Sequence, residues 1–270
     1  FLYVGPGFRA IAQDGNIIQS RSYTDQCQQI GMEAFNEDFV MQKCESICKE
    51  AVELLDADEC PTEQMDLVLH SDQMLLQIHE SIGHALEVDR ILGDERNYAG
   101  WSFVNLEDFG KLKYGSDLMN ITFDPTIKEE FASYGFDDTG NKASKEFIIK
   151  EGVLQRGLGG LESQERANIE GVANVRACSW NRAPIDRMAN LNLEPGDSSF
   201  DEMISSVKKG IFMQTNRSWS IDDFRNKFQF GCEYAQLIEN GKITKTVKNP
   251  NYRAISTPFW NSLKKVGNMD

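Results

Sequence analysis

The feature that most constrains this chain is a pair of histidines with a carboxylate beside the first. Residues 79–84 read His-Glu-Ser-Ile-Gly-His and contain two of the three histidines in 270 residues. Imidazole is a common zinc ligand, and a glutamate next to the first ligand can act as general base on metal-bound water. The H-E-x-x-x-H pattern is one residue longer than the H-E-x-x-H motif of zinc peptidases. His79 and His84 are therefore candidate ligands for Zn²⁺, and Glu80 is the candidate catalytic residue.

The extra residue in the motif changes the geometry that the helix must adopt. On a regular α-helix, side chains four residues apart differ by about 40° around the axis, whereas side chains five apart differ by about 140°. The helix is therefore predicted to kink, bulge or end between His79 and His84. Gly83 is predicted to permit this, because glycine tolerates backbone angles that other residues resist. The alternative is two ordinary histidines on a buried helix, and the combination with Glu80 and Gly83 favours the metal site.

Composition excludes several classes of protein. The chain carries a net charge of −14, and this surface charge disfavours binding to nucleic acid. No apolar run approaches the roughly 20 residues that a membrane-spanning helix needs. Six cysteines in a chain of this length do not predict a disulfide framework, and reduced thiols in a cytoplasmic protein are the expectation. The chain opens at Phe1 rather than at methionine, so we expect residues to precede it.

Turn residues between β-prone runs predict three hairpins. The predicted hairpins are residues 8–23 turning at Asp14-Gly15, residues 146–154 turning at Glu151-Gly152, and residues 228–244 turning at Asn240-Gly241. With few helices between them, these hairpins predict an α+β fold with a substantial antiparallel β-sheet. One of the helices carries the HExxxH motif.

Capping residues predict where three helices begin. Asn36 is expected to cap a helix that ends near Asp56, and Ser71 or Asp72 to cap the motif helix after a strand at 65–70. Ser199 and Glu202 form a predicted capping box, whose helix should run to Lys208-Lys209 and stop at Gly210. The stretch from Asp58 to Thr62 is the best candidate domain boundary.

The motif and its flanks resemble the TldD/PmbA family, also called the modulator of DNA gyrase family. The resemblance lies in the strand 66–69 leading into 79–87, in Arg187-Met188 followed by Leu193-Glu194-Pro195-Gly196, and in Phe230-Gly231-Cys232 with residues 237–242. It implies that residues 1–57 are the end of an N-terminal domain with its connecting helix. Residues 58–270 would then be a C-terminal metallopeptidase domain, truncated at its C-terminus.

The resemblance also implies an activity and partners. It implies a cytoplasmic zinc metallopeptidase that cleaves unfolded or extended polypeptides and forms a homodimer or a heterodimer with a related subunit. The motif carries over as His79 and His84 for the metal and Glu80 for catalysis. The family's third ligand is a cysteine that we expect beyond Asp270, and Cys232 is the alternative ligand within this chain.

Two other functions stay open at this point. The chain could be a non-catalytic peptide-binding or regulatory subunit, although the family's metal-free members lack the H-E-x-x-x-H residues that are intact here. It could also hydrolyse non-peptide amides with the same site. Arginines between 166 and 187 could bind a substrate carboxylate, but a structural ion-pair role is favoured for them.

Overall fold

The computed structural model describes residues 2–24 and 27–269, which form two compact units. The first unit contains the described residues up to Leu76 together with Ser198–Ser220 and Gln229–Tyr252. The second unit contains Gln77–Asp197, Ile221–Phe228 and the residues from Arg253 onward. The predicted division of the chain after residue 57 stays a prediction.

Most residues of a mixed sheet of six strands lie in the first unit. Its order is β3-β13-β12-β11-β4, with β14 paired to β12. The strands are β3 (Asp58–Glu59), β4 (Asp66–Leu69), β11 (Lys209–Ile221), β12 (Lys227–Glu239), β13 (Lys242–Lys248) and β14 (Asn251–Ile255). The β12–β13 hairpin turns at Asn240 and Gly241, which both have positive φ, as the sequence predicted. By contrast, β4 pairs in parallel with β11, and β3 pairs in parallel with β13.

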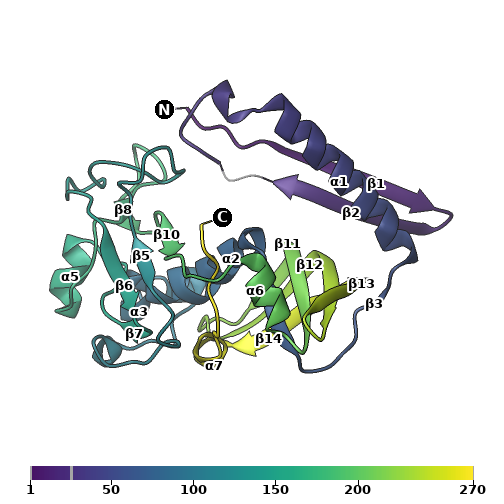
Figure 1. The fold of residues 1–270 in the computed structure, drawn as a ribbon. Helices are drawn as coiled ribbons and strands as arrows, with labels where there is room; N and C mark the ends of the chain where they lie inside the picture. The colour runs from purple at the N-terminus through teal and green to yellow at the C-terminus, as the bar shows by residue number, and fades with distance from the viewer. Residues whose placement is uncertain (1, 25–26, 270) are drawn as a thin grey trace. The chain divides into compact units, whose positions relative to one another are not determined.

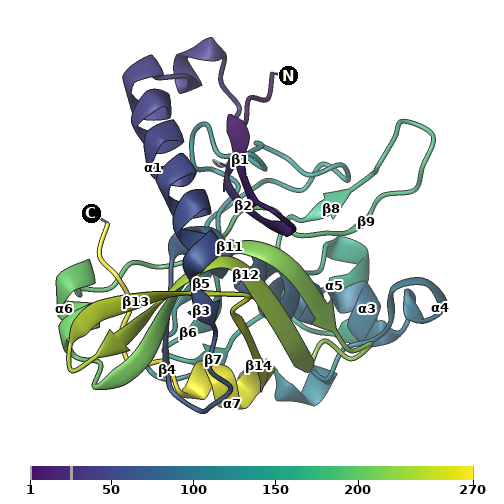
Figure 2. The same ribbon diagram turned by 90° about the vertical axis from the view of Figure 1, so that its right-hand side faces the viewer.

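A second hairpin and a long helix make up most of the rest of the first unit (Figures 1 and 2). Strands β1 (Gly7–Asp14) and β2 (Ile17–Thr24) are antiparallel, with Asp14 opposite Ile17, which confirms the predicted hairpin. The helix α1 spans Glu37–Asp56, and the Asn36 side chain accepts a hydrogen bond from the N–H of Phe39. The predicted cap and end of this helix are therefore confirmed.

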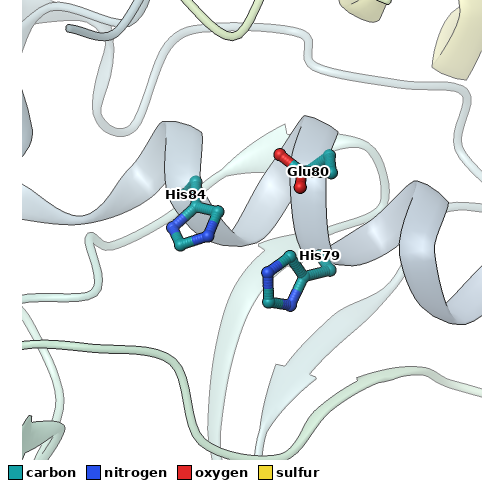
Figure 3. A group of neighbouring side chains, drawn as sticks. All are labelled: His79, Glu80 and His84. Carbon is teal, nitrogen blue, oxygen red and sulfur yellow. The ribbon is translucent and has the colours of Figure 1, made fainter. Parts of the chain in front are cut away.

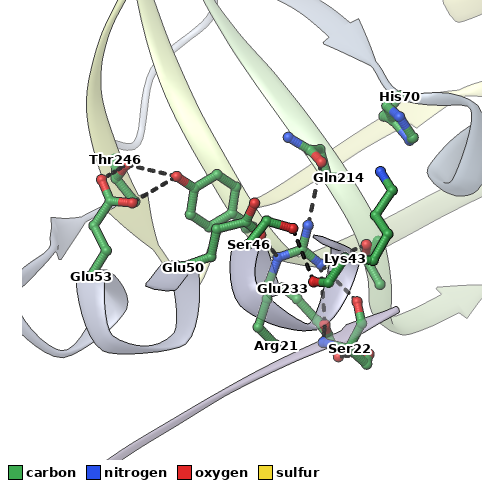
Figure 4. A network of polar contacts seen from close by, with 12 residues as sticks. Arg21, Ser22, Lys43, Ser46, Glu50, Glu53, His70, Gln214, Glu233 and Thr246 are labelled. Atoms are coloured by element: carbon green, nitrogen blue, oxygen red, sulfur yellow. Dashed lines mark hydrogen bonds and ion pairs between the residues drawn. The ribbon is translucent and has the colours of Figure 1, made fainter. Parts of the chain in front are cut away.

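Arg21 on β2 joins the hairpin to α1 and to the sheet within the first unit (Figure 4). Its side chain is 3% exposed and donates to the Glu50 carboxylate on α1 at 2.7 Å and to Thr215 Oγ1 on β11 at 2.7 Å. The Glu233 carboxylate on β12 lies 3.4 Å away. Buried charges are stable only when they are paired, so this network supplies the partners that the guanidinium requires.

Two predicted features of the first unit are wrong. The capping box at Ser199 and Glu202 is present, but its helix α6 (Phe200–Ser205) ends before the lysines. Gly210 is no helix terminus, because it lies in β11 opposite Asp66 of β4, where an added Cβ would be 2.6 Å from the Asp66 carbonyl oxygen. The predicted cap of the motif helix is also wrong. Helix α2 (Ser71–Ile78) already includes both candidate cap residues, and the Asp72 carboxylate accepts hydrogen bonds from Thr215.

The second unit is built on a four-stranded antiparallel sheet of order β10-β5-β6-β7. Its strands are β5 (Ile121–Phe123), β6 (Glu146–Lys150), β7 (Val153–Leu154) and β10 (Leu191–Leu193), beside a small hairpin of β8 (Val175–Arg176) and β9 (Ile185–Asp186). The α-helices are α3 (Val88–Leu92), α4 (Arg96–Ala99), α5 (Leu161–Ala167) and α7 (Ser256–Asn261). The predicted turn at Glu151-Gly152 is confirmed. The α+β prediction with a large antiparallel component is therefore confirmed across the two units.

The structure also bears on two expectations from composition, which concern the cysteines and membrane-spanning helices. All six cysteines are free, which agrees with the expectation of reduced thiols. Among the residues that the structure covers, no helix combines the length and the apolar character that crossing a membrane would require.

Candidate metal centre

The helix that carries the motif widens at the motif itself. After α2, residues His79–Gly83 form a π-helical turn, η2, which is followed by a 3₁₀ turn, η3 (His84–Leu86). The N–H of His84 donates to the carbonyl oxygen of His79, which is the five-residue hydrogen bond of a π-helix. This turn is one residue wider than an α-helical turn, so it brings residues five apart to the same side. The predicted bulge between the two histidines is confirmed.

Ser81 is the residue that stabilises the widened turn. Its hydroxyl donates to the carbonyl oxygen of Gln77 at 2.6 Å, a bond that competes with the helical backbone and bends helices. The same hydroxyl accepts from Gln77 Nε2 and from the indole N–H of Trp260, each at 2.9 Å, and Tyr114 Oη donates to the Ser81 carbonyl oxygen. Ser81, Tyr114 and Trp260 are fully buried, so the local distortion is held by the core of the second unit.

Gly83 contributes to the turn through packing, contrary to the prediction from its backbone freedom. Its angles are φ −53° and ψ −68°, which any residue adopts in a helix. A Cβ at this position would lie 1.8 Å from the sulfur of Met188. The Met188 side chain therefore occupies the space beside Gly83, and a larger residue at this position would have to displace it.

The turn brings His79, Glu80 and His84 together (Figure 3). Their potential ligand atoms all lie within 4.8 Å of one another, and the two imidazole rings are 4.6 Å apart between centroids with an interplanar angle of 89°. Loss of water around its ring and the neighbouring His84 lower the pKa of His79, which favours the neutral imidazole. Two imidazoles and a carboxylate form a donor set that suits a divalent transition metal.

Glu87 orients one of the two histidines. Its carboxylate is completely buried and lies 2.9 Å from His84 Nδ1, which leaves Nε2 of His84 available. Burial alone would raise the pKa of Glu87, but the bond to His84 and the nearby arginines lower it overall. A carboxylate on the second ring nitrogen is the usual support of a metal-binding histidine. Sequence analysis missed Glu87, although its position three residues after His84 was a usable signal.

Glu87 belongs to a buried cluster of carboxylates and arginines. Arg90 contacts the carboxylates of Glu87 at 3.2 Å and Glu95 at 2.9 Å, and Arg187 contacts Glu95 at 2.7 Å. This pairing agrees with the structural role that the sequence favoured for Arg187. Asp89 forms no ion pair within 4 Å among the described residues, and burial followed by repulsion from Asp186 and Glu95 raises its pKa to about 8. The Asp89 carboxyl is therefore largely protonated at neutral pH.

Arg225 pairs with Glu80, the carboxylate of the candidate metal site. Its Nη1 donates to Glu80 Oε2 at 2.7 Å, and the Glu80 side chain is only 7% exposed. The two residues are 145 positions apart in the chain. No local sequence pattern links them, so sequence analysis had no signal for this contact.

Cys232, the alternative third ligand, lies in the core of the first unit. It is fully buried on β12 among Ile211, Met213, Ala235 and Val247. Burial and the nearby Asp72 carboxylate raise the pKa of its thiol well above the usual range. Because metals bind the thiolate, this environment makes Cys232 a poor ligand.

The fold and the site together define an α+β protein with a potential metal centre on a π-helical turn. The family model described as the PmbA/TldA metallopeptidase C-terminal domain matches residues 62–269. This match covers well over half of the chain, and the chain therefore belongs to the PmbA/TldD metallopeptidase family, as the resemblance predicted.

Individual relatives agree with this assignment. A metalloprotease of Methanocaldococcus jannaschii is 35% identical over 199 residues, which are 74% of this chain and 42% of that protein. A zinc metalloprotease TldD homolog of Saccharolobus solfataricus is 24% identical over 172 residues, 63% of this chain and 36% of that protein. The chain thus spans less than half the length of these relatives.

A solved structure shares the fold. The crystal structure of TldE from Thermococcus kodakarensis matches with a TM-score of 0.79 over 98% of this chain and 57% of that chain, at 14% identity. At this identity the similarity supports the fold alone.

Proposed function

We propose that the chain is the metal-binding part of a zinc-dependent peptidase that acts on unfolded or extended polypeptides. The observation that carries the proposal is the π-helical turn, which brings potential ligand atoms of His79, Glu80 and His84 within 4.8 Å of one another. A helix without this bulge would direct the two imidazoles to different sides. The relatives' names supply the reaction class, and one of them names zinc.

In this proposal His79 and His84 hold the ion. The lowered pKa of His79 keeps that ring neutral near pH 7, as a ligand must be. Glu87 orients His84 by accepting a hydrogen bond from its Nδ1–H. When bound, zinc supplies Lewis acidity toward the scissile carbonyl and toward the attacking water. The remaining ligand is expected to be the cysteine that the family resemblance implies, outside these 270 residues.

Glu80 is assigned as the general base. It is adjacent to His79 in sequence and lies within the same 4.8 Å cluster, so a water beside the histidines is within its reach. Its carboxylate takes a proton from the attacking water and passes it to the leaving amine. The Glu80 carboxylate pairs with Arg225 at 2.7 Å, a contact that fixes its orientation.

The substrate and the assembly state follow from the family rather than from the site. An extended polypeptide offers main-chain groups to a sheet edge, a binding mode that prefers unfolded chains. We propose a homodimer or a heterodimer with a related subunit in the cytoplasm. The similarity to a TldE structure is compatible with such a pairing.

The test is Glu80→Gln in the natural full-length protein. The variant should keep its zinc and lose peptide cleavage by about 10²–10⁴-fold, because glutamine retains the size of the side chain but cannot take a proton. Zinc content is measured by elemental analysis, and cleavage is measured on a reduced and alkylated polypeptide. Glu165→Gln, which changes an exposed glutamate of the same unit, is the matched control.

Three outcomes separate the interpretations. Wild-type cleavage with zinc bound would show that Glu80 is not the base. Loss of zinc in Glu80→Gln would make Glu80 a ligand or a structural residue. A wild-type protein that binds zinc but cleaves nothing would favour the non-catalytic subunit instead.

A further inference from the structure

We propose that Arg225 is a positioning residue that holds Glu80 as a base and prevents its carboxylate from becoming a metal ligand. The proposal rests on the function proposed above and concerns the division of labour within the same site.

The need for such a residue follows from the closeness of the three side chains. A Glu80 oxygen lies in the same 4.8 Å cluster as the imidazole nitrogens, and carboxylate oxygens are ordinary zinc ligands. A carboxylate that coordinates the ion is a weaker base, because the nearby positive charge favours its ionised form over its protonated form. The motif alone therefore permits two roles for Glu80, and these roles compete with each other.

Arg225 is placed to decide between them. Its Nη1 donates to Glu80 Oε2 at 2.7 Å, while Nη2 donates to the carbonyl oxygen of Ala99 at 3.3 Å. The two side chains are 17% and 7% exposed, so water screens their attraction much less than at the surface. A guanidinium stays charged at all relevant pH values and uses planar, directional donors, so it fixes the orientation of the carboxylate as well as its charge.

The backbone around Arg225 is held in place. Arg225 has φ +61°, a conformation that costs free energy for a residue with a side chain. Its N–H donates to the Asp222 carbonyl oxygen at 2.9 Å, and its own carbonyl oxygen accepts from Ser256 Oγ at 3.1 Å. The neighbouring Phe224 stacks on Trp101 with an interplanar angle of 11°. The loop therefore presents Arg225 from a fixed position.

Affinity for a cation does not explain this arginine. Its guanidinium lies 2.7 Å from the Glu80 carboxylate, which belongs to the same 4.8 Å cluster as the imidazole nitrogens, so it is close enough to repel a divalent ion bound there. A site selected only for tight metal binding would not hold a permanent cation there. Control of Glu80 accounts for the placement.

The experiment is a double-mutant cycle on zinc affinity in the full-length protein. Wild type, Arg225→Met, Glu80→Gln and the double variant are titrated with Zn²⁺ against a chromophoric chelator. Arg225→Met should tighten binding when Glu80 is present and should tighten it much less in the Glu80→Gln background, where only the repulsion is relieved. We expect a coupling of about tenfold, within the range for residues in contact.

Activity gives a second readout. Arg225→Met should lower kcat by about 10–100-fold with a smaller change in KM, as is typical when a supporting residue of a metal site is removed. Arg225→Lys should recover part of kcat, because an ammonium can pair with Glu80 but lacks the second nitrogen with which the guanidinium reaches Ala99. Arg166→Met is the matched control, since it removes an arginine that pairs with Asp94 in the same unit.

The results distinguish this inference from the proposed function. Equal tightening by Arg225→Met in both Glu80 backgrounds would show that Arg225 acts only through its charge and would overturn the positioning role. A wild-type protein whose zinc binding does not depend on His79 and His84 would overturn the proposed function itself.

Discussion

Gly83→Ala tests whether packing against Met188 sets the π-helical turn. The added Cβ would lie 1.8 Å from the Met188 sulfur, 2.9 Å from its Cγ and 3.1 Å from its Cε. Overpacking of this kind costs about 1–3 kcal/mol. Replacing a helical glycine by alanine raises the free energy of unfolding by about 0.5–1 kcal/mol, because the unfolded chain has less conformational freedom with alanine than with glycine. The net loss should therefore be about 1 kcal/mol, with a range from near zero to about 2.5 kcal/mol.

The assay is thermal unfolding of the single and double variants with Met188→Ala. A loss of about 1 kcal/mol corresponds to about 2–4 °C in Tm for a protein of roughly this size. In the Met188→Ala background the clash is gone, so Gly83→Ala should be neutral or slightly stabilising. The single variant should also bind zinc more weakly, because the displaced turn ends at His84. Gly135→Ala is the control, since an added Cβ there meets no atom within 4 Å.

One result would refute this reasoning. If Gly83→Ala costs the same free energy with and without Met188, the contact is not the cause. The requirement for glycine would then lie in the backbone, as the sequence first indicated.

Three further predictions concern groups around the site. Glu87→Gln should weaken zinc binding by about 10–100-fold, because His84 loses its orienting carboxylate, and an unchanged affinity in a zinc titration would contradict this role. Asp89 has its pKa raised in the native state to about 8 from an ordinary 3.8, so its contribution to stability is present at low pH and is lost as the pH rises through 8. Denaturation at pH 6 and pH 9 should show wild type losing more stability than Asp89→Asn, whereas parallel losses would assign the pH dependence to other groups. Cys232→Ala should leave zinc content unchanged and lower Tm, and loss of the metal from a folded variant would restore Cys232 as a ligand.

The sequence by itself determined the features that depend on neighbouring residues. Asn240-Gly241 and Asp14-Gly15 mark their hairpins because Asn240, Gly241 and Gly15 reach positive φ at low cost. Asn36 begins α1 because its side chain bonds an N–H three residues ahead. The spacing of His79 and His84 required a distortion in the helix because side-chain direction follows from the residues per turn.

Only the tertiary structure decided the features that depend on distant residues. Gly210 follows a helix and looks like its end, but it is needed where β11 pairs with Asp66. Gly83 and Arg225 likewise take their roles from Met188 and Glu80, which lie far away in the chain. A local pattern constrains backbone angles within a few residues, whereas the space beside a glycine and the partner of a buried carboxylate are set by segments that meet only after folding.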